Sequence, residues 1–246
     1  MTVEFAAEFV SVAVDIFGPA ATVTAAERGP VGNGQETWFC EIAVGEDSHQ
    51  VVVRRTAESG PLQWTDRSAE ATALRWLESA DVPTPEVLHF EPDGGRLGRA
   101  AIAMERMPGG PLGRVDQATR DRLGAGLGRN LARLHAIDVS GFGGDIPSDI
   151  RAATSGQLAF WAGRYRSDAL MPVPLLGALL AWLGAEQPER GGSPALVWGD
   201  PGLYNILHED GEVTALLDWE LAHVGDPLED LGAAVWSCRG PVSYTH

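Results

Sequence analysis

Residues 197–231 read VWGDPGLYNILHEDGEVTALLDWELAHVGDPLEDL, and this stretch decides how the rest of the chain is interpreted. Asp200 is followed five positions later by Asn205, and an apolar run over 213–217 that predicts a strand leads directly into Asp218. A carboxylate that can accept a proton, with an amide and a second carboxylate that can bind metal ions, is the set of groups that phosphoryl transfer uses. The stretch therefore predicts two short loops that carry a phosphoryl-transfer site.

Composition and charge narrow the class of protein. The chain has 246 residues, enough for one large domain or two small lobes, and its net charge is −16. This charge argues against nucleic acid or an anionic membrane as a partner, and a solvated acidic face explains it better than a cationic substrate does. No apolar run is long enough to span a bilayer, and the first 15 residues are too acidic for a secretory signal. Two distant cysteines suggest a reduced, cytoplasmic chain without a disulfide framework.

Hydrophobic periodicity predicts a β-rich front half and a helical back half, an α+β arrangement. In the front half we expect a helix ended by Gly18 and Pro19, strands over 38–44, 50–54 and 100–104, and a helix over 68–79. In the back half we expect helices over 117–137, 158–165 and 175–183. The Pro/Gly cluster within 105–110 is the best candidate for a hinge, which divides the chain into residues 1–106 and 107–246.

These motifs resemble those of the aminoglycoside phosphotransferase superfamily. Its members are related to the protein kinases but phosphorylate small molecules, and they include choline kinases. The family's HGDxxxxN loop corresponds to residues 198–205, its metal aspartate to Asp218 and its GDPxxDL motif to residues 225–231. The Trp-Gly-Asp-Pro variant is most similar to the phosphotransferase-like domains fused to some acyl-CoA dehydrogenases. The resemblance implies a two-lobed, protein-kinase-like fold: an N-lobe over 1–106 with an antiparallel sheet, and a helical C-lobe over 107–246, together one phosphotransferase domain.

The resemblance also implies an activity, namely transfer of the γ-phosphoryl group of ATP to a hydroxyl of a small molecule. Asp200 would act as the base that takes the proton of the acceptor hydroxyl. Asn205 and Asp218 would bind Mg²⁺, an ion that prefers oxygen ligands and takes only one or two protein carboxylates. Each of these residues alone could be an ordinary turn or cap residue, but the three together at these spacings are specific.

The nucleotide would lie in the front half. Gly32 and Gly34 occupy the position of the family's phosphate loop, although Asn-Gly is equally typical of a plain hairpin turn. The hinge backbone from Glu105 to Met107 would hold the adenine. These residues predict that one face of the front sheet forms the nucleotide site.

All 18 basic residues are arginines, so the family's phosphate-anchoring lysine is absent. Strand alternation puts Val52 and Arg54 on one face, and Arg54 would take the role of the lysine with Glu70 as its partner. The alternative is that Arg54 and Arg55 are solvent-facing strand residues.

Other conspicuous residues are expected to be structural. His135 lies in a leucine-rich helix, and Asp226 and Asp230 are expected to brace the catalytic loop or cap a helix. We expect three further tryptophans to belong to the core rather than to a stacking platform: Trp161, Trp182 and Trp236.

Besides the absent lysine, two further departures from the family pattern leave alternatives open. Trp198 replaces the usual histidine, and only 16 residues follow Asp230, whereas relatives continue with further helices. The final GPVSYTH resembles translated adapter sequence, so we expect a C-terminally truncated chain with an incomplete C-lobe that could self-associate. The alternatives to a kinase are a non-catalytic nucleotide-binding pseudokinase, an inactive fragment, or a metal-dependent phosphohydrolase. The acceptor and the choice between ATP and GTP are not encoded in the motifs present.

Overall fold

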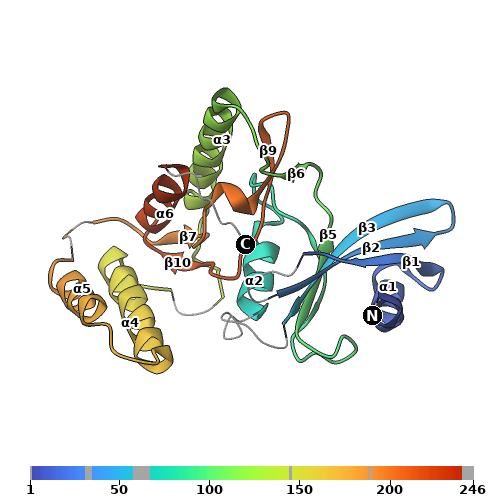
Figure 1. Cartoon of the computed structure of the whole chain (residues 1–246), viewed down its shortest axis with the longest axis horizontal. Helices are drawn as coiled ribbons and strands as arrows, with labels where there is room; N and C mark the ends of the chain where they lie inside the picture. Colours follow the sequence, from blue (N-terminus) through green and yellow to red (C-terminus); the bar gives the residue numbers. More distant parts are fainter. Residues whose placement is uncertain are drawn as a thin grey trace.

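A computed structural model of the chain describes residues 2–30, 35–57, 67–143, 146–187, 189 and 191–239. Its elements form two lobes of different composition, an N-terminal sheet with two helices and a larger helical part with short strands (Figure 1). The chain is therefore an α+β protein with a β-rich N-lobe and a helical C-lobe, as the sequence predicts.

The N-lobe is a five-stranded antiparallel sheet in the order β1-β2-β3-β5-β4. One face packs against helix α1 through Phe5, Phe9 and Val12, which share a buried cluster with Trp38 of β2. The other face packs against helix α2 and the C-lobe core. The bounds of these elements are α1 (Thr2–Phe17), β1 (Ala21–Arg28), β2 (Gln35–Val44), β3 (Asp47–Thr56), α2 (Arg67–Leu77), β4 (Val87–Glu91) and β5 (Ala101–Glu105).

Strand alternation in β3 separates two functional faces, as predicted. Val51 and Val53 are buried against the α1 side, whereas Val52 and Arg54 point to the opposite side, which faces the C-lobe. Arg54 is therefore not a solvent-facing strand residue.

The described part of the C-lobe combines four α-helices and one short 3₁₀-helix with two small sheets. Strand β7 pairs with β10, and β6, β8 and β9 form a three-stranded sheet at the lobe boundary. Asp116 and Asp149 begin helices α3 and α4 because each side chain accepts a backbone N–H of the first turn. The bounds are β6 (Gly110–Pro111), α3 (Gln117–His135), α4 (Ile150–Asp168), α5 (Pro174–Ala185), β7 (Ala195–Val197), η1 (Leu203–Asn205), β8 (Ile206–Glu209), β9 (Glu212–Leu216), β10 (His223–Gly225) and α6 (Leu228–Arg239).

The sheet of the N-lobe ends at Glu105, and the next strand, β6, pairs with β8 of the C-lobe. We therefore propose the boundary between the lobes at residues 106 and 107. Among the residues that the structure describes, no helix is long and apolar enough to cross a membrane.

The prediction that three tryptophans belong to the core is wrong. Trp161, Trp182 and Trp236 are 45%, 59% and 67% exposed. They lie on α4, α5 and α6, and α5 has no buried residue at all. An apolar helix face is buried only when another element packs on it, and a single helix sequence does not say whether one does. Several of the observed strands were not predicted: β1, β4, β6, β8 and β10.

Candidate active site

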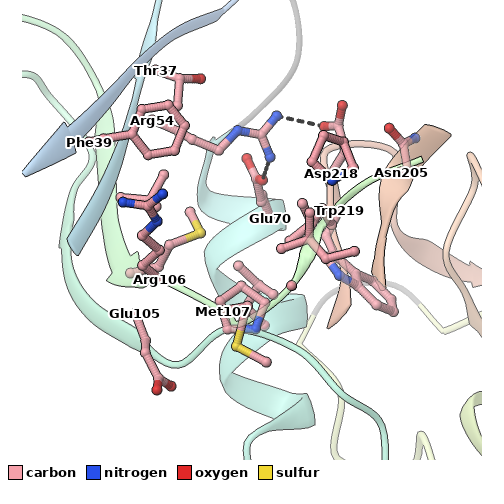
Figure 2. A pocket seen from close by; sticks show the side chains of 18 of the residues that line it. Thr37, Phe39, Arg54, Glu70, Glu105, Arg106, Met107, Asn205, Asp218 and Trp219 are labelled. Carbon is pink, nitrogen blue, oxygen red and sulfur yellow. Dashed lines mark hydrogen bonds and ion pairs between the residues drawn. The ribbon is translucent and has the colours of Figure 1, made fainter. Parts of the chain in front are cut away.

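A cavity of about 390 Å³ lies between the lobes, and it gathers most of the predicted site residues (Figure 2). Strand β3, helix α2, the hinge and the loops before β8 and after β9 all contribute to its walls. Seven predicted residues line it: Val52, Arg54, Glu70, Glu105, Met107, Asn205 and Asp218. Gly32 and Gly34 lie outside the described residues. Asp200 does not line the cavity but is hydrogen-bonded to Asn205, which does.

Arg54 links three elements at the centre of this cavity. Its Nη1 donates to Glu70 of α2 at 2.5 Å and its Nη2 donates to Asp218 at 2.7 Å, so the guanidinium lies between two carboxylates (Figure 2). Burial alone would lower the pKa of Arg54, but the charges of Glu70 and Asp218 outweigh this effect and raise it. Arg54 is therefore a fixed positive charge in a cavity that is also lined by three carboxylates, those of Glu70, Glu105 and Asp218.

A second arginine extends this contact into a ring of charges. Arg67, which is 2% exposed, donates to Glu70 and, at 2.5 Å, to Glu220. Because Glu220 follows Asp218 by two positions, the series Asp218–Arg54–Glu70–Arg67–Glu220 begins and ends on the same loop. Gln35, at the start of β2, also donates to Glu220. Burial raises the pKa of the Glu70 carboxyl, and the two guanidinium groups oppose that rise.

Sequence reasoning missed Arg67 and Glu220. The only signals were local ones: Arg67 precedes Glu70 by one helical turn, and Glu220 follows the proposed metal ligand. The two residues are 153 positions apart in the sequence, so no local pattern indicates that they pair.

The loop from Asp200 to Asn205 holds the Asp200 carboxylate by both oxygens. The Asn205 Nδ2 donates to Oδ2 of Asp200 at 2.8 Å and to its backbone carbonyl at 3.0 Å. The hydroxyl of Tyr204 donates to Oδ1 at 2.5 Å. Tyr204, which also lines the cavity, was not singled out in the sequence.

The loop that carries Asp218 has an unusual backbone, held by the tryptophan that replaces the family's histidine. Asp218 has a φ of 64°, in the left-handed region that few side chains adopt. The indole N–H of Trp198 donates to the carbonyls of Leu217 at 3.0 Å and Asp218 at 3.2 Å, which fixes this conformation. The Leu217 N–H in turn donates to the Asn205 carbonyl at 2.8 Å, and this bond joins the two loops.

The predicted structural roles of His135 and Asp230 are confirmed. Asp230 is fully buried, and its carboxylate accepts the backbone N–H groups of Trp198 and Gly199, each at 2.9 Å. The Nε2 of His135 lies 2.9 Å from the same carboxylate. Asp226 accepts the N–H of Leu228 at the start of α6, which is the predicted cap.

A second cavity of about 460 Å³ lies on the other side of the catalytic loop. Gly199 and Leu221 form one wall, and Phe160 and Trp161 of α4 form another, with half-exposed rings. His223 also lines it, with Nδ1 2.9 Å from the Leu221 carbonyl and Nε2 3.3 Å from Glu229. Burial alone would lower the pKa of His223, but its contacts with Glu229 and Leu221 raise it.

The residues present fit a magnesium ion that is shared with phosphate groups. Asn205 uses its amide nitrogen on Asp200, which leaves Oδ1 as the ligand atom beside the Asp218 carboxylate. Within the described ranges, no group of three or more His, Cys, Asp or Glu side chains is arranged to hold a metal ion. A magnesium ion at Asn205 and Asp218 would therefore complete its coordination with phosphate oxygens and water.

Relatives of the chain in sequence are longer proteins. The chain is 28% identical over 222 residues to acyl-CoA dehydrogenase family member 10 of Mus musculus, a match that covers 87% of this chain and 20% of the relative. It is 32% identical over 209 residues to acyl-CoA dehydrogenase family member 11 of Gallus gallus, covering 79% and 26%. The chain thus spans about a fifth to a quarter of the length of these curated relatives.

Solved structures show the same fold in phosphotransferases. A thermostable mutant of the aminoglycoside phosphotransferase APH(4)-Ia, in ternary complex with ADP and hygromycin B, has a TM-score of 0.66 at 21% identity, covering 92% of this chain and 75% of that one. The macrolide 2′-phosphotransferase MphH from Brachybacterium faecium has a TM-score of 0.61 at 22% identity, covering 94% and 78%. The model of the phosphotransferase enzyme family matches residues 27–243, which is most of the chain. With this match and the shared kinase-like fold, the chain belongs to the phosphotransferase enzyme family.

Proposed function

We propose that the chain is an ATP-dependent kinase that transfers the γ-phosphoryl group to a hydroxyl of a small molecule. The observation that carries this proposal is the position of Arg54, bonded at once to Glu70 and Asp218 in the cavity between the lobes. A buried cation held between a helix carboxylate and a loop carboxylate, with a second oxygen ligand beside it, is suited to binding nucleotide phosphates.

Each end of the cavity would take a different part of the nucleotide. The backbone from Glu105 to Met107 and the side chain of Val52 would contact the adenine. Arg54, braced by Glu70, would bind phosphate oxygens, together with the backbone near Gly32 and Gly34.

Asn205 and Asp218 would hold the magnesium ion, which when bound neutralises phosphate charge and aligns the phosphates. Asp200 would orient the acceptor hydroxyl and take its proton through Oδ1, the oxygen that the Asn205 amide does not contact. The cavity beside α4 borders the same loop and would hold the body of the acceptor. Small-molecule acceptors such as the hygromycin B seen with one structural relative support this class of substrate.

Single-turnover transfer from γ-labelled ATP in the presence of Mg²⁺ tests this function against a panel of small alcohols, including aminoglycosides. Asp200→Asn is expected to slow transfer by about 10²–10⁴-fold, and Asp218→Ala is expected to abolish it. Asp210→Asn is the matched control, because Asp210 lies in the exposed turn between β8 and β9 and has a left-handed φ that asparagine tolerates. Full activity of both site variants would show that the assignment is wrong.

A second candidate is a nucleotide-binding module without turnover, and one contact favours it. Arg54 already occupies an oxygen of Asp218, the proposed metal ligand, at 2.7 Å. If that contact persists with nucleotide bound, the site binds nucleotide but does not align it. Magnesium-dependent stabilisation by ADP, without phosphate transfer to any alcohol tested, would distinguish this module from a kinase.

We also propose a cytoplasmic location and self-association through the exposed apolar residues of α5, such as Leu175 and Trp182. Sedimentation velocity of the wild-type chain and of Leu175→Ser would test the association.

A further inference from the structure

Tyr204 places a hydroxyl where the acceptor hydroxyl of a kinase has to lie. One oxygen of the Asp200 carboxylate, Oδ2, accepts a hydrogen bond from the Asn205 amide at 2.8 Å, and Oδ1 is the oxygen that this amide does not contact. The Tyr204 hydroxyl donates to this oxygen at 2.5 Å. The chain therefore supplies its own hydroxyl to the proposed base.

The same side chain reaches the proposed nucleotide site. Tyr204 lines the cavity between the lobes together with Arg54, Asn205 and Asp218. It precedes Asn205 directly in the chain and is 48% exposed, so its ring is not fixed in the core. A terminal phosphate bound at Arg54 and Asp218 would thus lie in the same cavity as the phenol.

The backbone of the loop is shaped to let the ring lie back over it. A Cβ atom at Gly202 would lie 2.2 Å from the Tyr204 ring, a distance that no side chain permits. The turn is fixed by the Gly202 N–H on the Asp200 carbonyl at 2.8 Å and by the Asn205 N–H on the Gly202 carbonyl at 2.9 Å. Glycine at position 202 therefore allows the approach of Tyr204 to Asp200.

We propose that Tyr204 is an autophosphorylation site, an inference that rests on the proposed kinase function. Without an acceptor, the Tyr204 oxygen attacks the γ-phosphorus of ATP bound to the same chain. The new O–P bond forms as the bond from the γ-phosphorus to the bridging oxygen of ADP breaks. The phenolic proton passes to Asp200, ADP leaves, and the products are phosphotyrosine and ADP.

Phosphorylation of Tyr204 inhibits the site that carries it out. A phosphate on Tyr204 adds close to two negative charges beside Asp200 and Asp218. These carboxylates repel it, and it fills the place of an acceptor hydroxyl, so the modified chain binds magnesium-nucleotide more weakly and loses transfer to acceptors. An acceptor that displaces Tyr204 from Asp200 protects the tyrosine.

The test incubates the full chain with Mg²⁺ and γ-labelled ATP without acceptor and locates the label by peptide mass spectrometry. We expect label on Tyr204, and its loss in Tyr204→Phe. Asp200→Asn is expected to slow labelling by about 10²–10⁴-fold, the usual contribution of a general base. Tyr165→Phe is the matched control and should label like wild type, because its hydroxyl contacts only the backbone of residue 173 among the contacts we describe.

A mixing experiment separates transfer within one chain from transfer between chains. The Asp200→Asn chain keeps Tyr204, and the Tyr204→Phe chain keeps Asp200. Mixing the two should label the Asp200→Asn chain no faster than it labels alone, and faster labelling would overturn transfer within the chain. Label at another residue, or none on a wild-type chain that binds magnesium-ATP in a calorimetric titration, would overturn the inference while leaving the proposed function intact. Absence of magnesium-ATP binding by the wild-type chain would overturn both. Because the site is located on wild-type protein, the result does not depend on folding of the variants.

Discussion

Substitution of Arg67 tests whether the ring of charges ties the lobes together. Arg67 is almost fully buried and bonds to Glu70 and Glu220. In Arg67→Met, Glu70 keeps Arg54 as a partner, but Glu220 keeps only the neutral amide of Gln35 among the contacts we describe. The substitution therefore removes the guanidinium group that Glu70 and Glu220 share.

The size of the effect follows from this burial. Removing one partner of a buried ion pair typically costs about 3–5 kcal/mol. In a chain of this length, each kcal/mol lowers Tm by about 2–4 °C, so Arg67→Met should melt roughly 6–20 °C below wild type. Glu220→Gln keeps a hydrogen-bonding side chain and removes only one bond between charged groups, so it should cost about 1.5–3 kcal/mol.

The double variant Arg67→Met/Glu220→Gln distinguishes a direct contact from two separate defects. Residues in one charge network couple by about 0.5–3 kcal/mol, so the double variant should be more stable than the sum of the single effects predicts. Thermal unfolding followed by circular dichroism measures all three variants. Arg129→Met is the control, because its contact with Glu212 is exposed and 3.8 Å long, and surface pairs contribute about 0.2–1 kcal/mol. Additive effects of the two substitutions, or an Arg67→Met chain that melts like the control, would refute the inter-lobe ring.

Three further predictions test other parts of the site. Gly199→Ala should destabilise the chain, because the φ of Gly199 is +90° and the new Cβ would lie 2.6 Å from a backbone oxygen. Gly124→Ala is the control: it lies in open space on α3 and should stabilise the chain by up to about 1 kcal/mol. Urea unfolding measures the stability of both variants. His223 has a pKa raised above its ordinary 6.5, so its contribution to stability is complete below that pH and is lost as pH rises through the folded-state value. Glu229→Gln should flatten this dependence in Tm measurements across pH 6–8, and an unchanged slope would contradict it. Burial raises the pKa of the Cys40 thiol to about 12, so a thiol reagent at pH 8 should modify Cys40 only after unfolding, as peptide mapping would show.

Much of the site could be predicted because it is local in sequence. The five-residue spacing of Asp200 and Asn205 fits one short loop, and alternation along β3 puts Arg54 on the same face as Val52. The left-handed φ of Asp218 could not be predicted, since it depends on the Trp198 indole that reaches the loop from a distant turn. The motif specified which residues belong together, but not which bonds hold them.

The remaining errors have one cause, which is that a side chain's neighbours come from elements far along the chain. Arg67 and Glu220 have no sequence relation, yet folding of the two lobes makes them partners. Trp182 lies on a helix as apolar as many core helices, but no described element buries it. Tyrosine is a common residue type, and the role of Tyr204 depends on how the turn after Asp200 directs its ring.

We propose that the absence of lysine changes the resting state of the site without removing its capacity to bind phosphate. A lysine has one compact ammonium group, whereas the planar fork of Arg54 holds Glu70 and Asp218 at the same time. The proposed metal ligand is therefore occupied until phosphate draws the guanidinium away, and magnesium should bind weakly unless nucleotide is present. Since Arg67 bonds to Glu220 independently of Arg54, the loop stays attached to α2 while Arg54 changes partners. The contact between Arg54 and Asp218 favours a non-catalytic module if it persists with nucleotide bound. In a kinase, the same contact would make magnesium binding depend on nucleotide.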